Sequence, residues 1–342
     1  MPIKFQLNDP SLESQWRALI LFGKNSATYK FAFAKALLGL VEEQKTRITL
    51  AEMAIPFADS IIDHLRKNDK QGNAASSTFL KGCREYIAGG LSKEQLYDIT
   101  EKHGFVHVVD AFQHVNGGTI PDTFYEKNYA QGKKEIVITD NLLQIKELFQ
   151  YRNLDQEVEA RWNLVETAWN LNINPNLLEV KYDADKSLFF IESDVMRRID
   201  VTSVRDSLNG YQKGKCFYSF QDISINKNDV NTCAVDHFLP HVNKQEHAQL
   251  GANINGVWNL VLADRTINNE KLAKIPEKRF LERLYNRNEF YIESKHPLAE
   301  TIINQTGHTP HTRQRFLESN YNLALSHSIQ KWKPSNELNG TF

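Results

Sequence analysis

Five polar residues in the C-terminal half of this chain have the types and spacing that phosphodiester hydrolysis requires. They are Asp236, His237, Asn259, Asn268 and Lys271. The Asp236 carboxylate and the Asn268 side-chain carbonyl are oxygen ligands of the kind that Mg²⁺ prefers, and such an ion neutralises charge on a leaving oxygen. His237, with an ordinary pKa near neutrality, could accept a proton from the attacking water. Asn259 could hold the loop after the histidine, and Lys271 could contact a phosphate oxygen.

A strand, a second strand and a helix must position these residues. The first strand ends at Pro240, the second covers 258–263, and a helix starts over 268–274. Neighbouring residues of an extended strand point to opposite faces. Asp236 and His237 therefore reach one site only if the strand twists or ends there, which the proline favours.

This segment resembles the HNH, or ββα-metal, nuclease motif, and its spacing is similar to that of the HNH domain of Cas9-type effectors. The resemblance covers about residues 213–280. It implies that Asp236 and Asn268 bind Mg²⁺ or Mn²⁺, that His237 is the general base, and that the product carries a 5′-phosphate. Asn259 takes the place of the structural middle residue of the motif, and Lys271 counts with the catalytic set.

The surroundings of the motif resemble a subgroup of standalone bacterial HNH proteins. The similar stretches are 208–218, 296–298 and 305–307. Members of this subgroup pair a helical N-terminal region with a C-terminal nuclease, and many act in restriction or phage defence. The resemblance thus implies DNA as substrate, and an ATPase or helicase of a defence system as a possible partner.

The chain departs from the zinc-braced bacterial members of this family. Those members hold zinc with two C-x-x-C pairs, whereas the matching positions 216–219 and 264–267 retain a single thiol, that of Cys216. Structural zinc needs four good donors, so we predict no structural zinc. Aromatic packing must then brace the motif, and the candidates are Phe217, Tyr218, Phe220 and Trp258.

Length and composition indicate a soluble globular protein of roughly two domains. The chain has 342 residues, of which 41% are hydrophobic and 24% charged, which is ordinary for a chain that buries a core. No apolar run approaches the ~18 residues of a membrane span, and the N-terminus shows no signal peptide. Three scattered cysteines disfavour disulfides and favour a reducing cytoplasm. The net charge of −1 is weakly acidic before residue 197 and weakly basic after it.

The pattern along the chain predicts an α+β protein. Residues 1–195 are expected to form a mainly helical recognition, partner or regulatory domain, and residues 196–342 an HNH nuclease domain with C-terminal helices. Within the first domain, Thr49 and Ser92 begin capping-box patterns, and Pro56 should bend or divide its helix. The elements expected further on are a strand at 135–139, a helix at 155–171 with a core-facing apolar stripe, and a hairpin at 178–191.

Four basic side chains near the motif could contact the DNA backbone without reading its sequence. They are Arg205, Lys213, Lys215 and Arg265. A solvated basic face would explain them equally well. The histidines of 308–311 could be a second metal pair, but Pro310 disfavours a helix there and a surface loop is the simpler interpretation.

Two alternatives to a DNA nuclease stay open. The chain could be a non-catalytic subunit that binds nucleic acid and docks a partner protein in a defence complex. It could also cleave RNA, because one metal ion and one histidine do not recognise a 2′-hydroxyl.

Overall fold

The computed structural model describes most of the chain. The described residues are 10–22, 27–72, 77–115, 118–129, 132, 134–170, 180–183, 185–192, 198–226, 228–241, 244–293, 296, 298–327 and 331–342. The fold divides into two compact units between residues 172 and 173, whereas the sequence suggested a boundary near residue 195. Among the described residues, no helix is both long and apolar enough to span a membrane.

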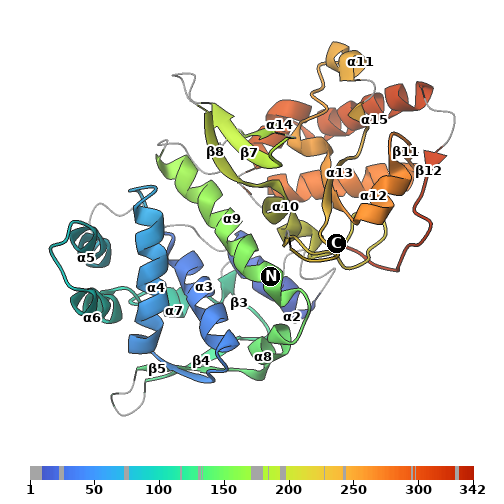
Figure 1. Cartoon of the computed structure of the whole chain (residues 1–342). Coiled ribbons are helices and arrows are strands. Elements are labelled where there is room, and N and C mark those ends of the chain that lie inside the picture. The colour runs from blue at the N-terminus through green and yellow to red at the C-terminus, as the bar shows by residue number, and fades with distance from the viewer. Residues whose placement is uncertain are drawn as a thin grey trace. The chain divides into compact units, whose positions relative to one another are not determined.

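The first unit is mainly helical with two small antiparallel sheets (Figure 1). Its described helices are α2 (Leu12–Phe22), α3 (Tyr29–Glu42), α4 (Leu50–Leu65), α5 (Thr78–Ile87), α6 (Lys93–His103), α7 (Val108–Ala111), α8 (Asp140–Lys146) and α9 (Tyr151–Asn170). Strand β5 (Glu135–Ile138) lies between β1 (Arg47–Thr49) and β4 (Tyr125–Asn128). Strands β2 (His114–Val115) and β3 (Gly118–Thr119) form a separate hairpin.

Local sequence signals place the helices of the first unit. Thr49 and Ser92 form the predicted capping boxes with Glu52 and Gln95, which satisfies free backbone N–H groups at the starts of α4 and α6. Of the two outcomes expected at Pro56, a bend or a division, the division does not occur, because α4 continues through the proline. The apolar stripe of α9 is buried as predicted, and Trp162 at its centre stacks on Phe31 of α3.

The second unit combines three small sheets with helices. Its described helices are α10 (Val204–Gln212), α11 (Lys244–Gln249), α12 (Arg265–Lys271), α13 (Lys278–Glu293), α14 (Ala299–Thr306) and α15 (Pro310–Ser326). The strands pair as β6 (Lys181–Asp183) with β7 (Leu188–Glu192) with β8 (Arg198–Ser203), β9 (Ala234–His237) with β10 (Leu260–Ala263), and β11 (Ile275–Pro276) with β12 (Lys331–Trp332). Helices and small, mainly antiparallel sheets define an α+β fold, as predicted. The predicted hairpin is β6–β7, although residues 178 and 179 lie outside the described part.

Two helix starts in the second unit differ from the sequence-based expectation. Helix α12 begins at Arg265, three residues before the predicted start, because the Asp264 carboxylate accepts hydrogen bonds from the backbone N–H groups of Thr266 and Ile267. Helix α15 begins at Pro310, where the sequence suggested a loop. A proline at the first helical position lacks a hydrogen that would have no helical partner anyway.

Candidate active site

Asp236 lies at the centre of a buried polar cluster on β9. Its neighbour across the antiparallel pair is Val261 of β10. One carboxylate oxygen accepts a hydrogen bond from the Tyr218 hydroxyl at 2.6 Å, and the Lys271 ammonium lies 3.0 Å from the carboxylate. Lys271 reaches this position from the last turn of α12, and its side chain is fully buried. The aspartate is thus an ionised acceptor between two donors.

Opposing effects act on the Asp236 carboxyl. Burial raises its pKa, while the Lys271 ammonium and the Tyr218 hydroxyl act to lower it, and the net pKa lies above the ordinary value. Burial raises the pKa of Tyr218 well above its usual range, and the adjacent Asp236 charge adds to this effect. The tyrosine therefore remains a neutral hydrogen-bond donor, and the carboxylate keeps its partners.

His237 ends strand β9, which meets the condition that the sequence set for an Asp-His pair to serve one site. Its Nε2 atom lies 3.0 Å from the Oδ1 atom of Asn255, and the Nε2 atom of His241 contacts the same oxygen. An amide oxygen only accepts hydrogen bonds, so Nε2 of His237 carries the proton and Nδ1 holds the free lone pair.

The surroundings of His237 favour its neutral form. Burial lowers the pKa of the imidazole to about 4, and the nearby His241 and Lys271 act in the same direction against the Asn255 hydrogen bond. A neutral imidazole at pH 7 has a lone pair ready to accept a proton. The geometry thus supplies the protonation state that a general base needs.

Asn259 fixes the loop that follows the histidine. Its side chain is fully buried, and its Oδ1 atom accepts a hydrogen bond from the backbone N–H of Leu239. Its Nδ2 atom donates to the backbone oxygens of Leu239 and Ile254. One amide therefore ties the exit of β9 to the segment that carries Asn255.

Asn268 lies on the same side of α12 as Lys271, because residues three apart are neighbours on a helix surface. Its side chain is partly exposed, and the side-chain amide makes no hydrogen bond to the described residues. The Asn268 amide thus stands one helical turn from the ammonium that binds Asp236, with its oxygen available. The adjacent Asn269 is exposed and lies on another face of the helix.

The donor types at this site fit a hard divalent cation. Asp236 and Asn268 offer one carboxylate and one amide oxygen, and substrate and water would complete the coordination. The Lys271 ammonium already neutralises the carboxylate, so an ion could bind only if this ammonium moved aside. Among the described residues, no three His, Cys, Asp or Glu side chains gather as a metal-binding cluster.

The four basic residues predicted near DNA differ in their exposure. Arg265 is exposed at the first position of α12. Lys215 pairs with Asp222 at 2.7 Å, and Arg205 donates to the backbone oxygen of Cys233. Lys213 is 5% exposed, so a phosphate contact would require its side chain to leave its present place. Arg265 is therefore the best presented of the four.

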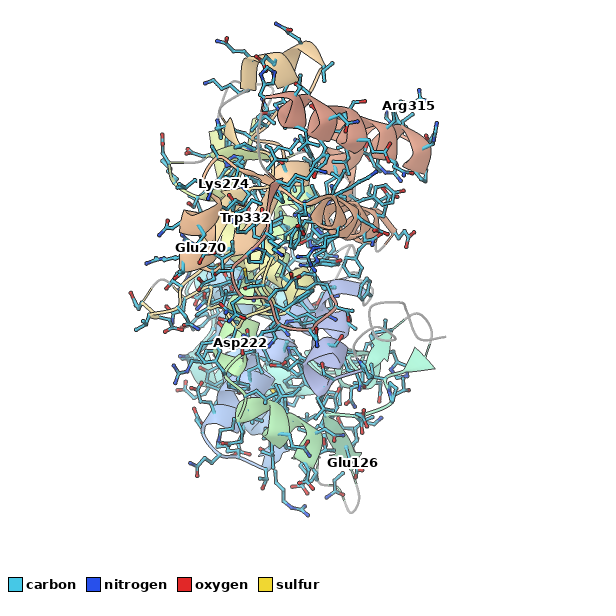
Figure 2. All side chains as sticks on the ribbon, turned by 90° about the vertical axis from the view of Figure 1, so that its right-hand side faces the viewer. Glu126, Asp222, Glu270, Lys274, Arg315 and Trp332 are labelled. Carbon is cyan, nitrogen blue, oxygen red and sulfur yellow. The ribbon has the colours of Figure 1, made fainter. Side chains whose placement is uncertain are left out.

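Aromatic rings and arginines brace the strand pair. Phe217, Tyr218 and Phe220 pack together with further aromatic rings, as the sequence suggested, whereas Trp258 packs elsewhere, against Phe316. The packing partners of the brace are Phe238, Phe280, Trp332 (labelled in Figure 2) and Phe342. Cys216 is a buried free thiol at the start of this turn.

Two arginines of α13 complete this brace. The Arg283 guanidinium stacks 4.2 Å from the centroid of the Phe220 ring and donates to the backbone oxygen of Phe217. Arg287 is fully buried and donates to backbone oxygens at the start of β10, namely those of Val257, Trp258 and Leu260. Side chains of one helix thus hold the short helical turn 257–259, which ends at Asn259, and the first residue of β10.

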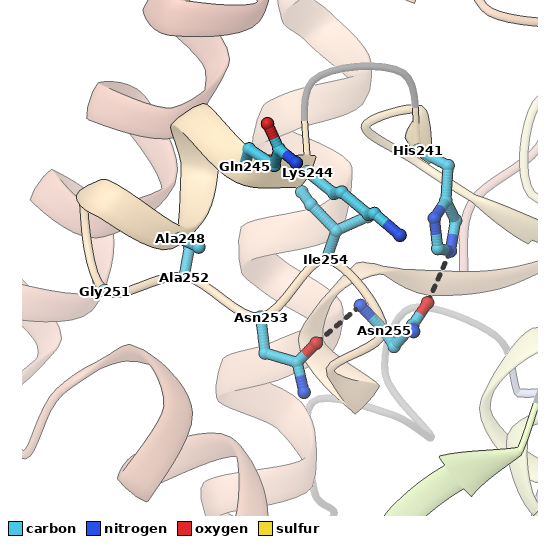
Figure 3. A pocket seen from close by; sticks show the side chains of 9 residues that line it. All are labelled: His241, Lys244, Gln245, Ala248, Gly251, Ala252, Asn253, Ile254 and Asn255. Carbon is cyan, nitrogen blue, oxygen red and sulfur yellow. Dashed lines mark hydrogen bonds between the residues drawn. The ribbon is translucent and has the colours of Figure 1, made fainter.

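A cavity of about 500 Å³ opens beside the histidines. It lies between α11 and residues 251–255, and His241 and Lys244 extend toward Asn255 there (Figure 3). Asn255 both lines this cavity and binds His237. Sequence reasoning missed Asn255, because the Asn-Gly pair at 255–256 indicates a turn and says nothing of a histidine partner. It assigned Tyr218 to packing alone, because nothing local to a Phe-rich segment reveals a carboxylate partner.

Comparison of the chain with protein-family models, with curated proteins and with solved structures finds no match.

Proposed function

We propose that the second unit is a metal-dependent HNH-type endonuclease that hydrolyses phosphodiester bonds in DNA. The observation that carries this proposal is His237 at the end of β9, next to the buried Asp236 carboxylate, in an antiparallel strand pair followed directly by a helix. Strand, strand and helix in this order, with Asn268 on the helix, are the features that the ββα-metal resemblance requires.

In this mechanism His237 acts through its Nδ1 atom. The imidazole accepts the proton of the attacking water, while Asn255 fixes the ring through Nε2. Asp236 and Asn268 would hold Mg²⁺ or Mn²⁺, which when bound supplies positive charge for the leaving oxygen. Lys271 would release the carboxylate, and its ammonium would then be free to contact a phosphate oxygen. Asn259 keeps the histidine loop in register.

Nicking of supercoiled plasmid DNA in Mg²⁺ tests this assignment. The His237→Ala variant should lose cleavage by about 10²- to 10⁴-fold, the usual contribution of a positioned general base, and should keep most of its DNA affinity. His308→Ala, which changes an exposed histidine, is the matched control and should cut like the wild type. Equal cutting by His237→Ala and the wild type would show that the mechanism is wrong.

A non-catalytic role is the second candidate, and the buried Lys271–Asp236 pair is the observation that favours it. Because the Lys271 ammonium already neutralises the Asp236 carboxylate, this part of the fold needs no bound cation for its stability. A binding subunit would hold DNA or a partner such as an ATPase or helicase tightly, yet show no cleavage with Mg²⁺ or Mn²⁺. RNA cleavage is tested in the same assay with a matched RNA duplex.

The biological setting proposed here is restriction or anti-phage defence in the cytoplasm, with the first unit as the recognition, partner or regulatory part. The three cysteines are free and buried, which suits a reducing compartment. Loss of plaque protection in cells that carry His237→Ala would support the defence role, and unchanged protection would contradict it.

A further inference from the structure

The cavity beside the histidines has the size and lining of a nucleotide site. Its volume of about 500 Å³ falls in the range of small-molecule pockets. The residues around it are His241, Lys244, Gln245, Ala248, Gly251, Ala252, Asn253, Ile254 and Asn255. Figure 3 shows His241 after β9, and the other residues on or next to α11 and on the segment that leads into the short helical turn before β10.

Apolar and amide groups share this lining. Ala248, Ala252 and Ile254 form its apolar part, which offers contact to the face of a base. Gln245 and Asn253 are exposed at the edge and carry both donors and acceptors. The Asn253 Oδ1 atom accepts from the backbone N–H of Asn255 at 3.0 Å, which fixes the orientation of this amide. A nucleotide base is bound by contacts to its face and by hydrogen bonds to its edge.

The charge of the lining matches a phosphate. Lys244 and His241 are exposed, and none of the nine lining residues is acidic. Glu246, the acidic residue of α11, turns to His327 at 2.8 Å instead. A backbone phosphate could therefore approach the Lys244 ammonium without meeting a carboxylate of the lining.

The cavity adjoins the proposed catalytic imidazole through one side chain. The Oδ1 atom of Asn255 contacts the Nε2 atoms of both His237 and His241. From this geometry we infer that the cavity binds one nucleotide of the cleaved strand, next to the scissile phosphate, with its base on the apolar lining and its phosphate at Lys244. This inference rests on the proposed nuclease function and adds a subsite to it.

The test combines DNA with single missing bases and a variant that fills the cavity. Both proteins carry His237→Ala to prevent cutting, and one also carries Ala248→Phe. A duplex series with one abasic position at a time is titrated by fluorescence anisotropy in Mg²⁺. With the cavity open, one abasic position near the cut should weaken binding about 5- to 100-fold, as expected for one bound base. With Ala248→Phe, that penalty should disappear.

Controls separate the subsite from the function. Ala88→Phe, on an exposed alanine of the first unit, should keep the full penalty, and Asn253→Ala should reduce it if Ala248→Phe misfolds. An equal penalty in open and filled proteins, or no sensitive position, would overturn the subsite alone when the wild type still cuts DNA. No binding of any duplex and no cutting would overturn the proposed function and the subsite with it.

Discussion

Each unit contains a partly or fully buried histidine, and the two have opposite environments. His64 of the first unit stacks on Trp162, with ring centroids 3.6 Å apart and planes 2° from parallel. Its Nδ1 atom lies 2.9 Å from a carboxylate oxygen of Glu166, and its Nε2 atom 3.3 Å from Glu159. His237 of the second unit has an amide and a second imidazole as its polar neighbours.

The partners decide the charge of each ring. Burial acts to lower the pKa of His64, but the hydrogen bonds with Glu159 and Glu166 more than offset this, and the pKa is raised. Burial also lowers the pKa of His237, and without a carboxylate partner it falls to about 4. The same side chain thus has a raised pKa in the first unit, where two carboxylates anchor it, and a lowered pKa in the second.

Removing the carboxylate-bound His64 ring should have the largest effect on stability. His64→Leu leaves the buried Glu166 carboxylate without its imidazole partner, and breaking a buried charge pair costs about 3–5 kcal/mol. Urea unfolding followed by circular dichroism measures this. His107→Leu, at an exposed histidine, should change the free energy of unfolding by less than about 0.5 kcal/mol. A similar small value for His64→Leu would mean that this ring is not an anchor.

Lys271→Met tests whether the charged pair of the second unit differs from that of the first. Without metal, the lone Asp236 carboxylate should cost about 3–5 kcal/mol. Because Asp236 and Asn268 offer oxygen ligands, Mg²⁺ at 100 times its dissociation constant should restore about 2.7 kcal/mol. Thermal unfolding measures the rescue when it is compared with and without added Mg²⁺ at about 10 mM. Absence of rescue, or equal rescue of His64→Leu, would argue against a cation site at Asp236.

Tyr218→Phe should have a smaller effect, because it removes one hydrogen bond and keeps the ring. Hydrogen bonds to charged groups contribute about 1.5–3 kcal/mol, and the Tyr218 hydroxyl donates to the Asp236 carboxylate. The matched variant Tyr321→Phe loses a bond to the neutral backbone oxygen of Pro276, which should cost about 0.5–1.5 kcal/mol. Denaturant midpoints compare the two. An equal loss would show that Asp236 is not held as a carboxylate.

The stability of the two units should change with pH in opposite directions. This change should be smallest near neutrality. The raised pKa of His64 gives the first unit stability that is complete below pH 6.5 and is lost as the pH rises through that pKa. His237 favours its neutral form, so its contribution is complete above pH 6.5 and is lost as the pH falls toward 4. Hydrogen exchange resolved by segment measures each unit. Cleavage should stay level from pH 8 to 6 and fall near pH 4, and an inflection at 6.5 would contradict this.

The sequence predicted the fold where signals are local. The capping boxes at Thr49 and Ser92, the strand at 135–139 and the buried stripe of the long helix need only neighbouring residues, and the structure confirms all of them. The predicted start of the helix after the second strand is too late, because the Asp264 cap begins α12 before the predicted residue. A single sequence left open whether Pro56 bends or divides its helix, and α4, which buries residues on both sides of the proline, is continuous.

The candidate site was predictable only as a set of residue types. The spacing of Asp236, His237 and Asn268 follows from the order of strand and helix, but their partners come from distant segments. The Tyr218 hydroxyl reaches Asp236 from a turn 18 positions earlier, and the Lys271 ammonium from 35 positions later. Packing in three dimensions decides such contacts, so a single sequence assigned Lys271 to phosphate where the structure pairs it with Asp236.

The arginines of α13 bear on where this unit could be divided. An isolated two-stranded pair such as β9–β10 is marginally stable in water. Here the Arg287 guanidinium, which lies outside the motif, donates hydrogen bonds to backbone oxygens at the start of β10. A fragment that stops at residue 280 would expose those oxygens and lose its clamp. The smallest excisable piece of this protein that retains β9 and β10 must therefore extend along α13 at least to Arg287.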